Sequence, residues 1–372
     1  MVSVKENIFD VMYEPLAGSS LSNLLRLISQ NKFCISPRYI PRFAYAMLMS
    51  TILSPFRLKE KISESKNIWL TEVKEDPIFI IGHWRSGTTY LHNVLSLNSS
   101  FGYCTTFHAT LPHVFLQSEE LLKPLLAASI PSKRPMDNAT MGPDLPQEEE
   151  YAIANIIPDG YYNGWCFPDN IHRYLNHVFV DSLSDEYQKE WMNTYSFFVK
   201  KLSRYHDGKQ LILKNPAHTA RLTVLKKLFP KAKFIHIYRN PYEVYYSMEK
   251  FIRIVLPRYC VQRPLSQKQM KELIISTYAR LYKTFFKQKK VISANNLIEI
   301  SYESFISSPL KAVEQIYDQF NLTYSERTKK QMKTYIDKQK NFKPSTYKMN
   351  QKLKNEIFNS WDFVFDRYKY SK

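Results

Sequence analysis

The sequence predicts an α/β fold in which a central parallel sheet is flanked by helices. Short apolar runs, of which residues 77–81 are unbroken, alternate with segments whose apolar spacing suits a helix, and a glycine-containing loop joins the first run to the first such segment. Strands that alternate with helices in this way need crossover connections, which give parallel pairing and helices on both faces of the sheet. The four predicted strands are residues 77–81, 211–213, 233–238 and 297–301.

A predicted helix follows each of these strands. Proline suits the first turn of a helix, because the N–H group that it lacks would have no partner inside the helix. Pro241 and Pro309 are therefore read as helix starts, while Pro230 ends the helix before it. The predicted helices are residues 88–97, 218–229, a helix beginning near 241, and 309–320.

The chain of 372 residues is long enough for one large α/β domain or for two domains, and we expect a single domain over residues 1–372. Insertions at the carboxyl ends of strands usually hold the substrate site, so we expect the insert between the first two strands to shape a substrate pocket. The predicted parts are a helical N-terminal extension at 1–70, a core at 76–322 with a helical insert at 103–200, and a basic C-terminal segment at 323–372.

Composition narrows the class of protein. Hydrophobic residues make up 44% of the chain, which excludes a disordered basic tail. The four cysteines are widely spaced and form no C-x-x-C pair, which argues against a disulfide framework and a zinc site. A net charge of +18 is compatible with nucleic acid, a membrane surface or an anionic small molecule. Because no nucleic-acid-binding motif is visible, we expect no nucleic-acid partner.

The first ten residues contain no apolar run after a basic start, so no secretory signal is expected. The longest apolar stretch, residues 44–56, is shorter than the ~20 residues that a membrane-spanning helix needs. We therefore expect a cytoplasmic protein. The amphipathic N-terminal helices, with Arg38, Arg42 and Arg57, are suited to peripheral contact with a membrane.

The loop after the first strand has the pattern of a phosphate-binding loop. Its G-x-x-x-x-G spacing matches a nucleotide P-loop, but Thr88 stands where the P-loop lysine would be. Consecutive backbone N–H groups and the dipole of the following helix favour an anion, and Arg85 adds a permanent charge. We expect the threonines to cap this helix. The candidate anion-binding residues are Arg85, Ser86, Gly87, Thr88 and Thr89.

A second motif lies at the end of the third strand. Arg239, Asn240 and Pro241 follow one another there, and Ser247 comes eight residues after Arg239. If the helix begins near Pro241, Ser247 is almost two turns into it. Arg239 and Ser247 then converge on one phosphate only if that phosphate lies beside the helix. Taken alone, an Arg-Asn-Pro sequence is more typical of a turn than of a site.

Together the two motifs resemble those of the sulfotransferases that use 3′-phosphoadenosine 5′-phosphosulfate (PAPS), and the pattern is most similar to the bacterial-type branch. The resemblance covers roughly residues 76–322 and implies a P-loop-like sulfotransferase fold. It implies that the first loop cradles the 5′-phosphosulfate, that Arg239 and Ser247 hold the 3′-phosphate, and that Tyr302 lies next to the adenine. Arg85 stands where many cytosolic members have lysine.

The resemblance also implies the reaction, which is transfer of a sulfonate to a hydroxyl with release of the 3′,5′-bisphosphate (PAP). We expect no metal, because no metal-ligand spacing is visible and Arg85 and Lys214 can supply the positive charge. Lys214 matches a family lysine near the transferring sulfonate. Many cytosolic members have a histidine base two residues later, where this chain has Pro216. Glu148 is therefore the first candidate for the base, followed by Glu149 and His218.

The acceptor is expected to be a lipophilic small molecule such as a sterol, a phenol or a lipid alcohol, because aromatic residues crowd the insert and apolar pockets suit such ligands. A carbohydrate sulfotransferase, a P-loop kinase and a basic nucleic-acid-binding protein are the alternatives. The sequence predicts no oligomeric state. The aromatic residues are Tyr103, Phe107, Phe115, Tyr151, Tyr161, Tyr162, Trp165 and Phe167.

Overall fold

The computed structural model describes residues 14–137, 139–339 and 350–372, so the first ten residues, in which no secretory signal is expected, lie outside it. The chain forms two compact units, each built from three separate segments. The N-terminal extension and most of the insert belong to the same unit, and the single domain stays a prediction. Unit 1 is Met1–Val73, Cys104–Gly208 and Lys250–Ser266, and unit 2 is Lys74–Tyr103, Lys209–Glu249 and Gln267–Lys372.

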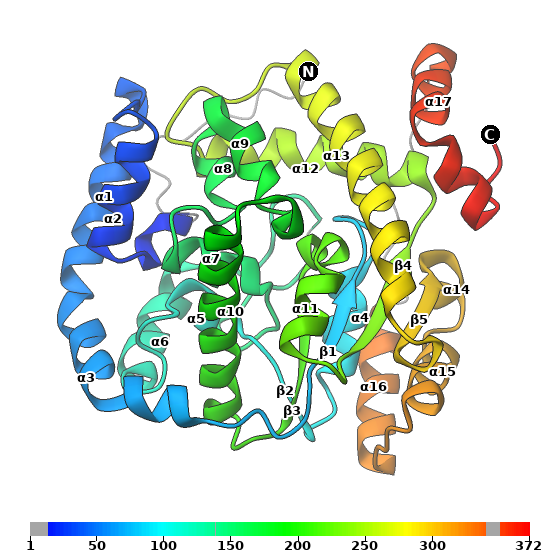
Figure 1. Ribbon diagram of the computed structural model, residues 1–372, viewed down its shortest axis with the longest axis horizontal. Coiled ribbons are helices and arrows are strands. Elements are labelled where there is room, and N and C mark those ends of the chain that lie inside the picture. The colour runs from blue at the N-terminus through cyan, green and yellow to red at the C-terminus, as the bar shows by residue number, and fades with distance from the viewer. Residues whose placement is uncertain (1–13, 138, 340–349) are drawn as a thin grey trace. The chain divides into compact units, whose positions relative to one another are not determined.

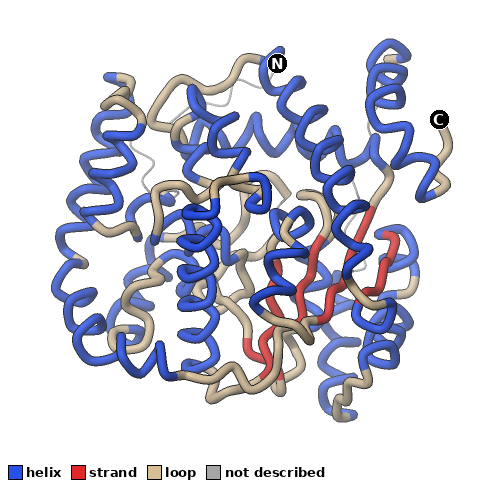
Figure 2. Tube along the Cα trace, in the orientation of Figure 1, coloured by secondary structure: helices blue, strands red, loops and turns tan. Residues whose placement is uncertain are grey.

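Unit 2 contains a five-stranded parallel sheet with the strand order β2-β3-β1-β4-β5. The strands run side by side in Figure 2, and helices pack on both faces of the sheet. The predicted α/β class and parallel sheet are thus confirmed. The strands are β1 (Ile78–Ile81), β2 (Phe101–Gly102), β3 (Gln210–Lys214), β4 (Lys233–Tyr238) and β5 (Leu297–Ser301).

The two faces of the sheet can be read from the alternation along each strand. Ile78 and Ile80 pack in a cluster with residues of α4, α15 and α16, whereas Phe79 packs against Phe229 and Phe234 on the opposite face. All four residues of β1 are buried, as expected of a central parallel strand covered on both sides. The helices of unit 2 are α4 (Thr88–Leu95), α11 (Leu222–Leu228), α13 (Gln267–Gln288), α14 (Tyr302–Ser307), α15 (Pro309–Phe320), α16 (Glu326–Gln339) and α17 (Gln351–Tyr368).

Unit 1 is helical in its described part (Figure 1). Its longest helix begins where the Ser184 side chain accepts a hydrogen bond from the Tyr187 amide, and its first helix begins at the Ser20 cap in the same manner. The helices are α1 (Leu21–Gln30), α2 (Ile40–Ile52), α3 (Ser54–Leu70), α5 (Thr106–Thr110), α6 (Glu119–Ser129), α7 (Glu149–Ile156), α8 (Asn163–Cys166), α9 (Ile171–Asn176) and α10 (Asp185–Tyr205); α12 (Pro241–Tyr259) has residues in both units.

Short 3₁₀ turns connect several of these helices. They are η2 (Pro15–Gly18), η3 (Pro37–Tyr39), η4 (Pro168–Asn170), η5 (Val180–Ser182), η6 (Pro216–Ala220), η7 (Lys289–Val291) and η8 (Ala294–Asn296). Among the helices of the described ranges, none combines the length and the apolar character needed to cross a bilayer.

Candidate functional site

The strand order of unit 2 brings three strand ends together. β1 lies between β3 and β4, with Ile80 opposite Lys214 in the register. The chain first builds the sheet to one side of β1 and then crosses to the other, which makes this edge a topological switch point, where open α/β sheets bind ligands. The loop at 82–89 follows β1, Lys214 ends β3, and Arg239 follows β4. All three predicted donor-site segments therefore meet at one edge of the sheet.

The loop after β1 depends on two glycines. Gly82 has a φ of 142° and Gly87 has a φ of 96°, both in the region that favours glycine. A Cβ atom on Gly82 would lie 2.2 Å from the carbonyl oxygen of Ile237, and one on Gly87 would lie 2.4 Å from the ring of Tyr302. Arg85 also has a positive φ, of 73°. The backbone therefore makes a tight turn that requires glycine at both positions.

The helix after this loop begins differently from the prediction. Gly87, in the left-handed conformation, is the cap residue of α4, and no side chain caps the helix. Thr88 and Thr89 are the first two helical residues, so the prediction that they cap it is wrong. The first N–H groups of α4 thus face the loop without a side-chain partner, the arrangement that helix N-termini offer to anions. Thr219, which sequence reasoning missed, accepts a 2.8 Å hydrogen bond from the Gly82 amide.

Side chains of the two sequence motifs contact each other directly. Arg85 Nε donates to Ser247 Oγ at 3.0 Å, and Arg239 Nη1 donates to the carbonyl oxygen of Arg85 at 3.2 Å. Glu243, in the first turn of α12, accepts from Arg239 Nη2 at 3.3 Å. The structure therefore gathers two guanidinium groups and a hydroxyl beside the first turns of α12.

Tyr302 supplies an aromatic surface next to these cations. It is the first residue of α14 and is buried, and the Arg239 guanidinium carbon lies 4.5 Å from its ring centre. Burial raises the pKa of its hydroxyl, so the ring stays neutral at physiological pH. The neighbouring Glu303 accepts hydrogen bonds from the Asn240 amide at 2.9 Å and the Tyr370 hydroxyl at 2.7 Å. The turn that carries Arg239 is thereby tied, through Glu303, to the segment that follows α17.

Lys214 is buried at the end of β3, where its ammonium group donates to Thr89 Oγ1 at 3.5 Å. The buried His92 donates from Nε2 to the carbonyl oxygen of Ile212 at 3.2 Å. Burial and the charge of Lys214 lower the pKa of His92 to about 3, so this neighbour is neutral at pH 7. Lys214 therefore brings a cation to the first turn of α4 beside an uncharged imidazole.

His218 lies in the core of unit 2. Its fully buried ring meets Phe79 edge-on, with ring centres 5.6 Å apart, and its Nδ1 lies 3.5 Å from Arg221 Nη1. Burial and the charge of Arg221 hold its pKa well below the usual range of histidine. A group in this position packs against the sheet and has no exposed surface.

The acidic cluster of unit 1 stands at the start of α7. Glu148 is the cap residue and is half-buried, whereas Glu149 and Glu150 are fully buried. Glu148 accepts a hydrogen bond from the Tyr162 hydroxyl, and Glu150 accepts one from the Tyr161 amide at 3.2 Å. Glu149 accepts from the Tyr195 hydroxyl at 3.3 Å. Glu148 thus combines a fixed orientation with partial exposure.

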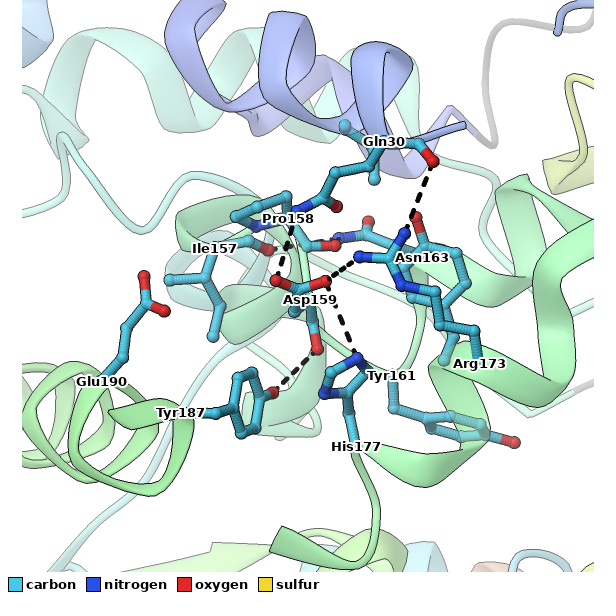
Figure 3. A network of polar contacts seen from close by, with 12 residues as sticks. Gln30, Ile157, Pro158, Asp159, Tyr161, Asn163, Arg173, His177, Tyr187 and Glu190 are labelled. Atoms are coloured by element: carbon cyan, nitrogen blue, oxygen red, sulfur yellow. Dashed lines mark hydrogen bonds and ion pairs between the residues drawn. The ribbon is translucent and has the colours of Figure 1, made fainter. Parts of the chain in front are cut away.

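A polar network holds the turn that carries these tyrosines (Figure 3). Asp159 Oδ1 accepts from Arg173 Nη2 at 2.7 Å and lies 3.7 Å from His177 Nε2. The carbonyl oxygen of Asp159 accepts from the Tyr187 hydroxyl at 2.9 Å, and the Asn163 side chain donates to the Pro158 carbonyl at 3.0 Å. The turn after α7 is therefore fixed from several sides, and it carries the Tyr161 amide and the Tyr162 hydroxyl that donate to the acidic cluster.

The aromatic residues expected to shape an acceptor pocket divide into two groups. Phe107, Phe115 and Phe167 are in the core of unit 1, with almost no exposed surface. Tyr103 belongs to neither group, because it lies in unit 2 and packs against the core cluster there. The others form a chain of rings beside Glu148: the ring centre of Tyr162 lies 4.6 Å from that of Tyr151 and 6.3 Å from that of Trp165. Only the second group adjoins a candidate catalytic side chain.

Comparison with known proteins now identifies the family. The sulfotransferase family model matches residues 77–326, about two thirds of the chain. The chain belongs to the sulfotransferase family. It is therefore a transferase, and its membership in this family sets aside the P-loop kinase and the noncatalytic nucleic-acid-binding protein as alternatives.

Relatives of this sulfotransferase are found in mycobacteria. The omega-hydroxy-beta-dihydromenaquinone-9 sulfotransferase Stf3 of Mycobacterium bovis is 28% identical over 359 residues, covering 95% of this chain and 91% of its own, and the Mycobacterium tuberculosis protein matches equally. The crystal structure of STF9 from Mycobacterium avium covers 94% of this chain and 96% of its own, with 15% identity and a TM-score of 0.66. STF1 from Mycobacterium tuberculosis covers 91% and 90%, with 18% identity and a TM-score of 0.62. The two solved structures share the fold.

Among the residues that the structure describes, no group of three or more histidine, cysteine, aspartate or glutamate side chains is placed to hold a metal ion. Three cationic side chains of this sulfotransferase, Arg85, Lys214 and Arg239, stand at the switch point.

Proposed function

We propose that this sulfotransferase moves a sulfonate group from PAPS to a hydroxyl of a lipophilic small molecule and releases PAP. The meeting of the Arg85 loop, Lys214 and the Arg239 turn at one edge of the sheet carries this proposal. The acceptor oxygen forms a bond to sulfur, the bond from sulfur to the bridging oxygen of the 5′-phosphate breaks, and the acceptor proton passes to a base.

The residues at the switch point fit the two anionic ends of PAPS. The uncapped N-terminus of α4, with Ser86, Gly87, Thr88 and Thr89, suits the 5′-phosphosulfate, because backbone N–H groups and the helix dipole favour an anion there. Arg239 and Ser247, held together through Arg85, suit the 3′-phosphate.

Tyr302 and Lys214 complete the proposed donor site. The ring of Tyr302 offers a flat surface on which the adenine stacks. Gly87 leaves room for this ring, because a Cβ atom at position 87 would collide with it. Lys214 neutralises the charge that grows on the bridging oxygen as the sulfonate leaves, because a cation already in place at a buried site stabilises developing charge effectively.

For the base, we keep the order Glu148, Glu149, His218. A general base must reach the acceptor hydroxyl, and Glu148 is the one of the three with partial exposure. Glu148→Gln is expected to lower the turnover rate by ~10²–10⁴ with little change in PAP affinity. If Glu148→Gln and Glu149→Gln both keep most of the activity and His218→Ala loses it, the ranking is wrong.

A lipophilic acceptor is supported by the rings beside Glu148 and by the relative Stf3, whose name describes an omega-hydroxylated menaquinone derivative. Contact with a membrane surface, where such acceptors dissolve, belongs to the same proposal. A carbohydrate acceptor is the alternative, since sugars also stack on aromatic rings. A screen of sterols, phenols, lipid alcohols and oligosaccharides with PAPS, read by mass spectrometry, decides between them. Selective sulfonation of the oligosaccharides overturns the lipophilic assignment.

Calorimetric titration with PAP tests the donor site. A charged hydrogen bond contributes roughly 1.5–3 kcal/mol, so Arg239→Ala should weaken PAP binding about ten- to a hundredfold. Arg327→Ala, at an exposed position on α16, is the matched control and should leave binding unchanged. Unchanged affinity in the Arg85→Ala/Arg239→Ala double variant rejects this placement of the site.

A further inference from the structure

Helices α2 and α3 follow one another in unit 1 (Figure 1). Both expose large apolar side chains to solvent. Exposed residues of this size are normal when scattered, but a concentration of them on adjacent helices indicates an interaction surface. We define the α2–α3 surface by six residues, each at least 47% exposed: Leu48, Ile52, Leu58, Ile62, Trp69 and Leu70.

The spacing of these residues places them on one side of each helix. Leu48 and Ile52 are four residues apart in α2, and Leu58, Ile62 and Trp69 follow at intervals of four and seven in α3. Side chains at these intervals line one face of an α-helix. The exposed residues therefore form stripes.

The charges of α3 are sorted by sign. Its two acids point inward: Glu60 accepts from the Leu116 amide at 2.7 Å and pairs with the buried Lys201, and Glu64 accepts from Arg204 Nε at 2.9 Å. Its lysines point outward, because Lys59, Lys61 and Lys66 are all exposed. The exposed ionised side chains of α2 and α3 are therefore positive without exception.

Two arginines that the sequence predicts at a membrane have another role. Arg42 is buried and donates to the Cys260 carbonyl at 2.8 Å, and Arg57 donates to the Ser19 carbonyl at 2.7 Å. Both guanidinium groups satisfy backbone carbonyls inside unit 1, so the prediction is wrong for them. Arg38 is exposed, outside α2 and α3.

We propose that the α2–α3 surface binds the face of a lipid bilayer that contains anionic lipids. Apolar stripes flanked by lysines suit the boundary between acyl chains and headgroups, because the lysine stems cover apolar surface while their ammonium groups reach the phosphates. A second copy of the chain fits less well, because a two-fold interface would set the same lysines against one another. This inference deepens the proposed function, because it assigns the membrane contact to one surface, and its test does not depend on sulfonate transfer.

The test is co-sedimentation of the full chain with vesicles of phosphatidylcholine and phosphatidylglycerol, compared with pure phosphatidylcholine. We expect binding to the mixed vesicles, weakening as salt rises. The Leu48→Gln/Ile62→Gln variant should bind at least tenfold more weakly, as should Lys59→Gln/Lys61→Gln/Lys66→Gln. Val291→Gln/Ile306→Gln removes exposed apolar residues of unit 2 and is the matched control, with binding as in wild type.

The PAP affinity of each variant is measured as well. It should stay at the wild-type value, which shows that the variants fold and separates this inference from the proposed function. Wild-type vesicle binding by Leu48→Gln/Ile62→Gln overturns the proposal, as does absence of binding by the wild-type chain. A dimer in sedimentation velocity that dissociates in the same variant assigns the surface to a second copy instead and equally overturns it.

Discussion

Replacement of Gly87 by alanine tests the tightest point of the proposed donor site. At a φ of 96°, any residue with a Cβ is strained by about 1–2 kcal/mol. The new Cβ would also lie 2.4 Å and 2.7 Å from two ring carbons of Tyr302, and overpacking of this kind costs about 1–3 kcal/mol. The ring cannot tilt away freely, because it is buried under the Arg239 guanidinium. The total, about 2–5 kcal/mol, divides between stability and binding.

Calorimetry with PAP and urea unfolding together measure both parts for Gly87→Ala. We expect PAP affinity to fall at least tenfold, which corresponds to about 1.4 kcal/mol. Gly142→Ala is the matched control, because its new Cβ meets only Leu145 carbons at an ordinary 3.7 Å. A Gly87→Ala/Tyr302→Ala double variant removes the clash but keeps the backbone strain, so the two changes should couple by about 1–3 kcal/mol in stability. Affinity within twofold of wild type, or strictly additive effects, would refute the reasoning.

Three further outcomes follow from the structure. Burial lowers the pKa of His83 to about 4 and those of His92 and His113 to about 3, whereas unfolded histidine titrates near 6.5. The stability that these neutral histidines contribute is complete above about pH 6.5. It is lost as pH falls to about 4 for His83 and to about 3 for His92 and His113, by up to about 1.4 kcal/mol per pH unit for each histidine. Urea unfolding at several pH values gives the free energy of unfolding as a function of pH. Below pH 6.5 this free energy should fall less steeply in His92→Gln than in the wild type, and equal pH dependence contradicts the argument. EDTA should leave turnover unchanged, because the site's own side chains supply its cations. A loss of turnover in EDTA that Mg²⁺ restores counts against the mechanism. Tyr370→Phe removes the hydrogen bond to Glu303 and should weaken PAP binding about three- to tenfold, and an unchanged dissociation constant shows that this contact does not order the turn.

Much of the fold was predictable because its signals are local. Strands that pack against helices leave short runs rich in apolar residues, and residues 233–238 and 297–301 match the observed strands at both ends. Pro309 marked the start of α15 correctly, because proline suits the first turn of a helix. β2 was missed because its two residues are too short to form a pattern. The strand order depends on contacts between distant segments, so no local signal carries it.

The candidate site was predictable only in part. The motif residues were found by their spacing, but their partners were not, since Thr219 and Glu303 contact the loop and the Arg239 turn from distant parts of the sequence. Helix capping was mispredicted because the left-handed conformation of Gly87 takes the cap position. Arg57 was misplaced because its carbonyl partners become neighbours only once the chain has folded.

The strand order also has a consequence for folding during synthesis on the ribosome. β1 and β2 are synthesised first, yet they are not neighbours, because β3 lies between them and pairs with both. β3 appears only after residues 103–209 have been made, and closing so long a loop makes sheet formation slow. Until then, a nascent chain carries two apolar strands with unpaired edges, the kind of species that aggregates or engages chaperones. A fragment that ends before Gln210 should therefore remain without a sheet, and completing β3 is the step that commits the chain to its fold.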